Sequence, residues 1–341
     1  MSRVSVVGLD IAKHVFQVHG IDASGAVLVR HQVRRIELLS YFCKLEPCLI
    51  GIEACSTAHY WGRELRALGH DVRLIPPQYV KPYVKRNKTD AADAEAICEA
   101  VTRPSMRFVA IKSADQQAVL TLHRIRDQLV RQRTMITNAL RWHMAEFGII
   151  EKQGIAGAKR LAEVVSDEAD HRLPDIARSA LFVLVEQLRD VMEKIDTLKR
   201  ELLAWHKQSE VSRRLAKIPG IGPVVATALA ATVPDASVFT SARQFAAWLG
   251  LVPRQHSTGG KPRLGGISKR GDGYLRRLLV TGATAALFRS KDTRNRPWVK
   301  ELLRRRPTKV VAVALANKMA RTAWALMNSG GVYRAPKPAA A

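Results

Sequence analysis

Four carboxylates in the N-terminal third of the chain stand where predicted strands and a helix begin or end. Asp10 and Glu53 each close an apolar, strand-like run. Asp90 and Asp93 lie three residues apart on a predicted helix that Thr89 could cap, and this spacing places both carboxylates on one helical face. A single aspartate at a strand end is most often a turn residue, but four acids at these positions favour a common site.

Carboxylates that converge repel one another unless a cation lies between them. Mg²⁺ prefers oxygen ligands, and Mn²⁺ accepts the same kind of ligand. Two such ions about 4 Å apart can activate a nucleophile and stabilise the leaving oxygen of a phosphodiester. We therefore predict that the four acids form a catalytic metal site: Asp10, Glu53, Asp90 and Asp93.

A second segment with reactive side chains, Phe245–Gly271, combines serine, threonine and glycine with many cationic residues. This composition suits a loop that approaches a phosphate backbone closely. A serine nucleophile needs an adjacent base, and the one candidate, His256, is of a residue type that on its own is more often structural. From the residues alone, a hydroxyl that hydrogen-bonds phosphate is therefore the better interpretation.

The segment Ile218–Ala226 has the form of a helix-hairpin-helix turn, with the sequence Ile-Pro-Gly-Ile-Gly-Pro-Val-Val-Ala. Its glycines allow a tight turn, and the helix that follows offers free backbone N–H groups to a phosphate. The alternative is a turn between two helices that simply pack together. Both interpretations fit the residues, and the first is favoured.

The elements that must position the four acids indicate an α/β domain. The expected order is strand, strand, strand, helix, strand, helix, strand, helix, and the first three strands form an antiparallel meander. This is the order of the ribonuclease H-like fold, although the order alone only indicates it. The elements before the last helix are expected over residues 3–9, 14–21, 26–34, 36–45, 48–52, 58–68 and 71–75.

The middle of the chain is predicted to form long helices, because apolar residues recur at helical spacing over 115–147. Over 181–205, steps of three and four alternate without a break, which is the pattern of a coiled-coil seam. An antiparallel hairpin within one chain and a dimerisation stalk both fit, because the 158–178 connection could serve either. The seam residues are Leu181, Leu184, Leu188, Val191, Ile195, Leu198, Leu202 and Trp205.

The composition limits the partners of the protein. The chain has 341 residues, of which 47% are hydrophobic, so it is long enough for two or three folded domains. Lys and Arg total 55 against 30 Asp and Glu, and the net charge of +25 indicates a nucleic-acid partner. Neither a membrane-spanning run nor a secretory leader is evident, so we expect a cytoplasmic protein without a membrane partner.

Three acidic motifs resemble those of a known family. Val7–Lys13, Ile52–Ala54 and Lys88–Ala94 are similar to the motifs of the DEDD-type insertion-sequence transposases, the recombinases of the "one-ten" family and most closely its "eleven-eleven" subgroup. The resemblance covers nearly the whole chain in the family's order. It implies a RuvC-like N-terminal domain, related to a Holliday-junction resolvase, in which the four acids bind metal.

The same resemblance implies a serine nucleophile that forms a covalent phosphoserine link to DNA. Ser257 is the matching residue, with Thr258 and Ser268 as rivals. The resemblance also implies a homo-oligomer, a dimer or a tetramer, in which the acidic site of one protomer meets the serine domain of another. In some members a noncoding bridge RNA acts as a guide. The cations expected to bind nucleic acid are Arg254, Lys261, Arg263, Lys269, Arg270 and Arg276.

We accordingly expect four regions along the chain. These are a RuvC-like catalytic domain over 1–110, a helical coiled-coil region over 111–210, a serine-containing transposase domain over 211–333 and a disordered tail over 334–341. The transposase domain is expected to be mostly α-helical, with short helices separated by Gly and Pro. Two other classes share part of the pattern. A Holliday-junction resolvase or structure-specific nuclease would need no serine domain, and a non-enzymatic DNA-binding protein would need no acidic site. The coiled coil and serine loop argue against the first, and the four acids argue against the second.

Overall fold

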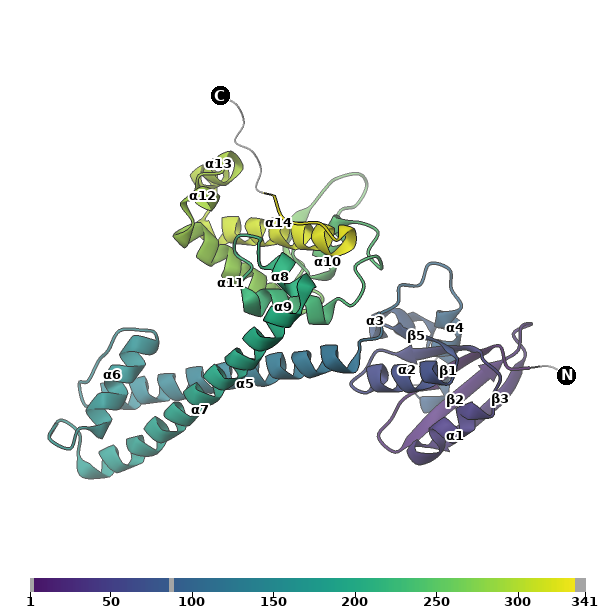
Figure 1. The fold of residues 1–341 in the computed structure, drawn as a ribbon, viewed down its shortest axis with the longest axis horizontal. Coiled ribbons are helices and arrows are strands. Elements are labelled where there is room, and N and C mark those ends of the chain that lie inside the picture. The colour runs from purple at the N-terminus through teal and green to yellow at the C-terminus, as the bar shows by residue number, and fades with distance from the viewer. Residues whose placement is uncertain (1–2, 86–88, 335–341) are drawn as a thin grey trace. The chain divides into compact units, whose positions relative to one another are not determined.

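The computed structural model describes residues 3–85 and 89–334 of the chain (Figure 1). The expected tail beyond Arg334 lies outside the described residues, and the predicted domain boundaries stay predictions. Among the described helices, none is both long enough and apolar enough to cross a membrane. Mutual contacts divide the chain into two compact units. The first unit contains the chain up to Gln117, Ala230–Gly273 and Ala320–Gly331. The second contains Ala118–Leu229, Tyr274–Met319 and the residues from Val332.

The first unit contains a five-stranded mixed sheet with the strand order β3-β2-β1-β4-β5. β1 pairs antiparallel with β2 and β2 with β3, whereas β1–β4 and β4–β5 are parallel pairs. The predicted meander and the two later strands are thus confirmed, and the topology fits the expected ribonuclease H-like fold. From β1 to β5 the strands span Val6–Asp10, Val15–Ile21, Val27–Arg34, Leu49–Glu53 and Asp71–Ile75.

Helices cover both faces of this sheet (Figure 1). α1 (Leu38–Cys43) and α2 (Ala58–Ala67) share one buried cluster with Val7 and Leu9 of β1. α4 (Asp90–Val101) lies on the other face, against β1, β2 and β4. Because side chains alternate along a strand, the even-numbered residues of β1 face α4. The remaining short turns of this region are η1 (Arg35–Glu37), α3 (Pro77–Val80) and η2 (Lys81–Tyr83).

The second unit is built mainly on two long helices with a shorter one between them. α5 (Ala114–Ala145), α6 (Ile155–Ser166) and α7 (Asp175–Gln208) contribute side chains to one buried cluster. The apolar stripe of α7 is therefore buried within one chain, which favours the hairpin interpretation, and a role of the stripe in dimerisation stays a prediction. The heptad residues in this cluster are Leu181, Leu188, Val191 and Ile195, and α5 contributes Ile136, Leu140 and Met144.

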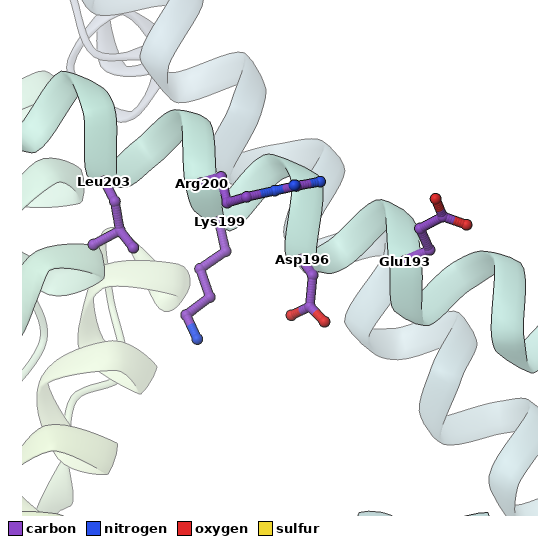
Figure 2. A pocket seen from close by; sticks show the side chains of 5 residues that line it. All are labelled: Glu193, Asp196, Lys199, Arg200 and Leu203. Carbon is purple, nitrogen blue, oxygen red and sulfur yellow. The ribbon is translucent and has the colours of Figure 1, made fainter.

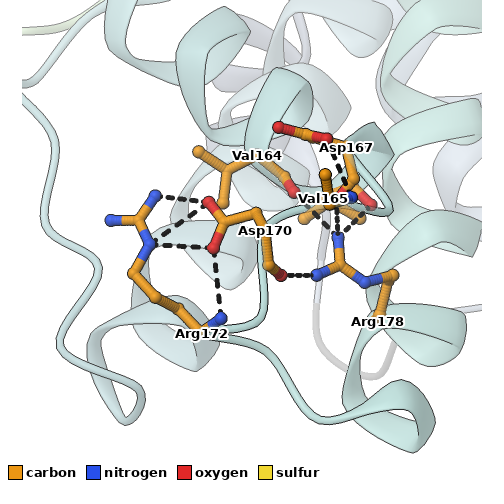
Figure 3. Close-up of polar contacts among 7 residues, drawn as sticks. Val164, Val165, Asp167, Asp170, Arg172 and Arg178 are labelled. Carbon is orange, nitrogen blue, oxygen red and sulfur yellow. Dashed lines mark hydrogen bonds and ion pairs between the residues drawn. The ribbon is translucent and has the colours of Figure 1, made fainter.

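One arginine holds the loop between α6 and α7 (Figure 3). Nη1 of Arg178, in the first turn of α7, donates hydrogen bonds to the carbonyl oxygens of Val164 and Val165 at 3.0 and 3.1 Å, and to that of Asp167. Its Nη2 donates to the carbonyl oxygen of Asp170. The guanidinium therefore satisfies carbonyls at the end of α6 that have no partner within the helix.

Replacing Arg178 by Ala should loosen this end of the hairpin. Several part-buried carbonyls would lose their charged donor, so we expect the free energy of unfolding to fall by about 2 kcal/mol. Arg172→Ala is the matched control, because Arg172 is exposed and pairs with the Asp170 carboxylate at the edge of the same loop. Chemical denaturation of both variants checks the prediction, and equal destabilisation by the two would contradict the capping role.

The C-terminal third is mostly helical, as expected, but it also contains a β-hairpin. β6 (Pro253–Gln255) and β7 (Leu264–Ile267) pair antiparallel in a segment that the sequence predicted as a loop. α11 (Gly273–Arg289) and α14 (Thr308–Ser329) have 17 and 22 residues, longer than the short helices expected here. The other helices are α8 (Glu210–Leu215), α9 (Pro223–Thr232), α10 (Ala242–Trp248), α12 (Lys291–Arg294) and α13 (Pro297–Arg305).

Candidate active site

Asp10 and Glu53 stand at the same edge of the sheet. They are the last residues of β1 and β4, two parallel neighbours. Leu9 of β1 is paired with Ile52 of β4, and Asp10 and Glu53 are the residues that come next in each strand. This pairing of neighbouring strands is what a common site for Asp10 and Glu53 requires.

Asp90 and Asp93 lie in the first turn of α4. Thr89 caps this helix as predicted, since its Oγ1 accepts a hydrogen bond from the Ala92 N–H at 3.2 Å. α4 packs on β1 and β4, and its N-terminal turn therefore belongs to the same site as the strand ends. Lys88, the first residue of this motif, lies outside the described residues.

Two glycines allow α4 to lie directly on the sheet. Gly8 and Gly51 are paired across β1 and β4, and each stands two residues before an acid. A Cβ at Gly8 would lie 2.0 Å from the Ala94 carbonyl oxygen, and one at Gly51 would lie 2.8 Å from the Val101 Cβ. Residues i and i+2 share a strand face, so the acids that follow these glycines face α4 too. Sequence reasoning missed this close contact between α4 and the sheet, although the Gly-x-Asp and Gly-x-Glu spacing is a signal for it.

The other three carboxylates are close enough to Asp10 to affect its ionisation. Burial, followed by the negative charges of Asp93, Asp90 and Glu53, raises the pKa of Asp10 from 3.8 to about 6. A hydrogen bond with the Ile11 backbone acts in the opposite direction but is the weakest of these influences. The energy of this repulsion is what a bound cation would relieve.

The donor set fits a hard divalent cation, because it consists of carboxylate oxygens on a rigid strand pair and one helix end. Across residues 3–85 and 89–334, no three His, Cys, Asp or Glu side chains are grouped tightly enough to hold a metal ion as they stand. Binding would therefore require the carboxylates to draw together.

Ser257 lies on the exposed β6–β7 hairpin. Its Oγ accepts two hydrogen bonds of 3.1 Å, one from Gln255 Nε2 and one from the backbone N–H of Arg263. Two N–H groups are thus directed at the oxygen that would act as a nucleophile, which is the kind of donor that stabilises developing negative charge. Both donors belong to the hairpin itself, and the hairpin therefore presents Ser257 as a preformed unit.

The hairpin turns at Gly259 and Gly260, whose φ angles are +53° and +74°. Two successive positive φ angles are typical of the type I′ turn, which fits the twist of a two-residue hairpin. Thr258 and Lys261 flank the turn, and the Lys261 N–H donates to the Thr258 carbonyl oxygen at 3.0 Å. A Gly-Gly pair is a hairpin signal, and the sequence prediction of a loop overlooked it. Of the two rival hydroxyls, Thr258 is thus exposed beside the turn, and Ser268 is half-buried after β7.

The cations expected to bind nucleic acid lie on the hairpin, after it, and on α11. Arg276 on α11 is half-buried, and the other five are exposed: Arg254, Lys261, Arg263, Lys269 and Arg270.

The Ile218–Ala226 segment joins α8 to α9 through a turn in which Gly220 adopts a φ of +92°. This confirms two helices connected by a glycine turn, while the contact of that turn with DNA remains a proposal.

A pocket on α7 is lined by none of the predicted site residues (Figure 2). Its lining combines two carboxylates, two cations and one leucine from a single helix. Because charges of both signs are present, this surface differs from the continuous positive surface that a nucleic-acid backbone requires. The lining residues are Glu193, Asp196, Lys199, Arg200 and Leu203.

Comparison with protein families identifies the class of the protein. Residues 7–149 match the sequence profile of the DEDD-type transposase domain of IS110. Residues 212–301 match the profile described as "Transposase IS116/IS110/IS902 family". The first match contains the four acids and the second contains the Ser257 hairpin, so both candidate sites lie in regions shared with transposases, the enzymes that cut and rejoin DNA.

Several curated relatives match the chain over almost its whole length. A probable family 20 transposase of Pseudomonas aeruginosa is 52% identical over 336 residues, which cover 97% of this chain and 99% of the relative. The transposase for insertion sequence element IS1328 of Yersinia enterocolitica is 44% identical, with 98% and 99% covered. That for IS1111A of Coxiella burnetii is 42% identical, with 98% and 92% covered. The chain belongs to the IS110 family of insertion-sequence transposases, as its motifs predicted.

Proposed function

We propose that this transposase cuts and rejoins DNA by metal-assisted phosphodiester transfer, with Ser257 as the nucleophile. The observation that carries the proposal is the placement of Asp10 and Glu53 at the adjoining ends of two parallel strands, with Asp90 and Asp93 in the first turn of the helix that packs on both strands. The raised pKa of Asp10, caused by burial and by the other three carboxylates, supports it. An isolated group of acids in a strongly basic protein that acts on a polyanion is costly unless it binds a cation. Mg²⁺ or Mn²⁺ held by the four acids would supply charge neutralisation at the reacting phosphate.

The chain's own residues would perform the following steps. Ser257 Oγ attacks the phosphorus of the target phosphodiester, and its proton leaves to water. The bond from phosphorus to one deoxyribose oxygen breaks, and that oxygen takes up a proton, which leaves a phosphoserine ester. A hydroxyl of another DNA strand then attacks the ester, so the phosphodiester forms again and the serine hydroxyl is released. Gln255 and the Arg263 N–H stabilise the serine oxygen as it enters and leaves.

The nucleic acid would be held by the hairpin cations, by Arg276 and by the N-terminus of α9. Backbone N–H groups at a helix start bind phosphate, and the Gly220–Gly222 turn precedes that start. We further propose a homo-oligomer, dimer or tetramer, in which the acids of one protomer act with Ser257 of another. The high positive charge also suits a noncoding guide RNA. The two hydrogen bonds of Ser257, both made within its hairpin, support a serine supplied to a separate acidic site.

Binding of a divalent cation to the four acids tests this proposal. We expect Mg²⁺ or Mn²⁺ to raise the melting temperature of the wild type at pH 8. An ion present at about ten times its Kd adds about 1.4 kcal/mol to stability. Asp93→Asn should abolish the shift, because it removes one ligand and its charge.

Asp71→Asn is the matched control for this experiment. Asp71 begins β5, so it lies at the opposite end of the sheet from Glu53, and it pairs with Arg73. This variant should keep the full metal-dependent shift. A shift of equal size in the Asp93 variant would show that the ion binds elsewhere, and the acidic metal site would then be rejected.

A further inference from the structure

His123 is a buried side chain on α5 that bonds to two other helices of the second unit. The residue is 1% exposed. Its Nε2 lies 3.0 Å from Thr227 Oγ1, near the start of α9. Its Nδ1 lies 2.9 Å from the Tyr274 hydroxyl, at the start of α11. One imidazole thus ties the beginnings of two helices to a third.

The neighbours of His123 determine where its proton lies. Thr227 Oγ1 is also 2.9 Å from the Pro223 carbonyl oxygen, to which it must donate. Thr227 therefore accepts from the His123 Nε2–H, which leaves Nδ1 free to accept from the Tyr274 hydroxyl. Burial and the nearby Arg126 lower the pKa of His123 to about 4, so the ring is neutral at pH 7 and suits both bonds.

Charged contacts reinforce this junction. Arg277 of α11 pairs with Asp127, which lies one turn after His123 on α5. The Arg277 guanidinium also lies 5.5 Å from the centre of the Tyr274 ring, within range of a cation–π interaction. The junction is therefore held by directional bonds, and these specify the positions of the helix starts more narrowly than apolar packing alone.

We propose that His123 is a positioning residue for nucleic-acid binding, which holds the starts of α9 and α11 on α5. The start of α9 follows the Gly220–Gly222 turn, and α11 carries Arg276 in its first turn. Both are phosphate contacts of the proposed function, on which this inference rests. Loss of the junction would release both contacts while leaving every cation in the chain.

The salt dependence of DNA binding tests this role. His123→Phe keeps a ring of similar size and removes both hydrogen bonds. Binding to a fluorescein-labelled duplex of the element end is measured over a series of salt concentrations. Loss of the one cationic phosphate contact, that of Arg276, makes the slope of log K against log salt shallower by about 0.9, so we expect a change of about 1. The uncharged N-terminus of α9 contributes to affinity but not to this slope. His123→Gln, which offers one donor and one acceptor, should recover part of the slope.

Two milder variants keep the test valid if His123→Phe does not fold. Tyr274→Phe and Thr227→Val each remove one hydroxyl. Tyr274→Phe should make the slope shallower by about 1, because α11 carries Arg276, whereas Thr227→Val should weaken binding at every salt concentration without changing the slope. Leu140→Ala is the control, because Leu140 is a fully buried residue of the same helix that makes none of these bonds. This variant should lower the melting temperature and leave the slope unchanged.

Three results are decisive. Wild-type slopes in His123→Phe and Tyr274→Phe, together with wild-type affinity in Thr227→Val, would overturn the positioning role. A slope change of the same size in Leu140→Ala would also overturn it, because the effect would then follow from lost stability. A slope near zero in the wild type, seen before any substitution, would instead reject the proposed docking surface, and the inference would fall with it.

Discussion

Asp10→Asn lowers the rate of DNA strand cleavage by at least about 10³-fold and, at the same time, stabilises the metal-free protein at pH 8. The two effects have one cause. The charge on Asp10 is needed to hold a cation, but without a cation it is disfavoured by burial and, further, by repulsion from three other carboxylates. The same substitution that removes the activity therefore removes the repulsion.

The pH dependence of the stabilising effect has a definite sign. The pKa of Asp10 is raised from 3.8 to about 6, so the folded protein holds this proton more tightly than the unfolded chain does. Stability from Asp10 is thus greatest below pH 3.8 and is lost as the pH rises through 6. The complete loss corresponds to about 3 kcal/mol at most. We expect Asp10→Asn to exceed the wild type in stability at pH 8 and to match it near pH 4.

Cleavage assays with Mg²⁺ and denaturation in EDTA at both pH values check this prediction. Glu53→Gln, Asp90→Asn and Asp93→Asn should lose cleavage in the same way, whereas the control Asp71→Asn should retain it. Full cleavage by any two of the four site variants would contradict a site made by all four acids. An Asp10→Asn protein that is less stable than the wild type at pH 8 would contradict the repulsion.

Ser257→Ala eliminates the covalent protein–DNA adduct that the wild type forms on a nicked suicide substrate. Such a substrate loses the strand needed for rejoining, so the phosphoserine ester accumulates and survives a denaturing gel. Removal of the nucleophilic oxygen leaves no atom that could form the ester, and we expect the adduct to fall below about 10⁻³ of the wild-type amount. Thr258→Ala and Ser268→Ala are the matched controls and should keep the adduct.

The outcomes of the adduct experiment separate the candidate mechanisms. An adduct that persists in Ser257→Ala but is lost in Thr258→Ala or Ser268→Ala would move the nucleophile to that hydroxyl. Cleavage by the wild type without any adduct would indicate direct attack by water or a DNA hydroxyl, as in a RuvC-like nuclease. In that case Ser257 would serve to bind phosphate through its place on the hairpin.

The α/β region could be predicted from sequence because its signals are local. Alternation of apolar and polar residues identified β2 and β3, and short apolar runs identified the strands that end at Asp10 and Glu53. The cap at Thr89 followed from residue type and position alone. The element order indicated the ribonuclease H-like fold, but the parallel pairing of β1 with β4 was only a condition for the four acids to converge, and the structure supplies it.

The features that were missed depend on contacts between distant segments. The pairing of Gly8 with Gly51 acquires meaning only when α4 is placed across both strands. The bonds of His123 join residues that lie 104 and 151 positions away, which no periodicity in a short window can reveal. The β6–β7 hairpin was overlooked for another reason, because its strands are three and four residues long and too short to show alternation.

The close contact of α4 with the sheet at Gly8 and Gly51 also determines how the acidic site responds to changes in salt and pH. The distance between α4 and the sheet is set there by backbone and Cβ atoms in van der Waals contact. Repulsion between such atoms rises steeply as they approach, so the two elements cannot move closer together. Salt screens charges and pH changes them, but neither alters atomic radii. The spacing of the ligand-bearing elements should therefore be mechanically constant across conditions that weaken every ion pair in the protein, with the carboxylate rotamers as the adjustable part.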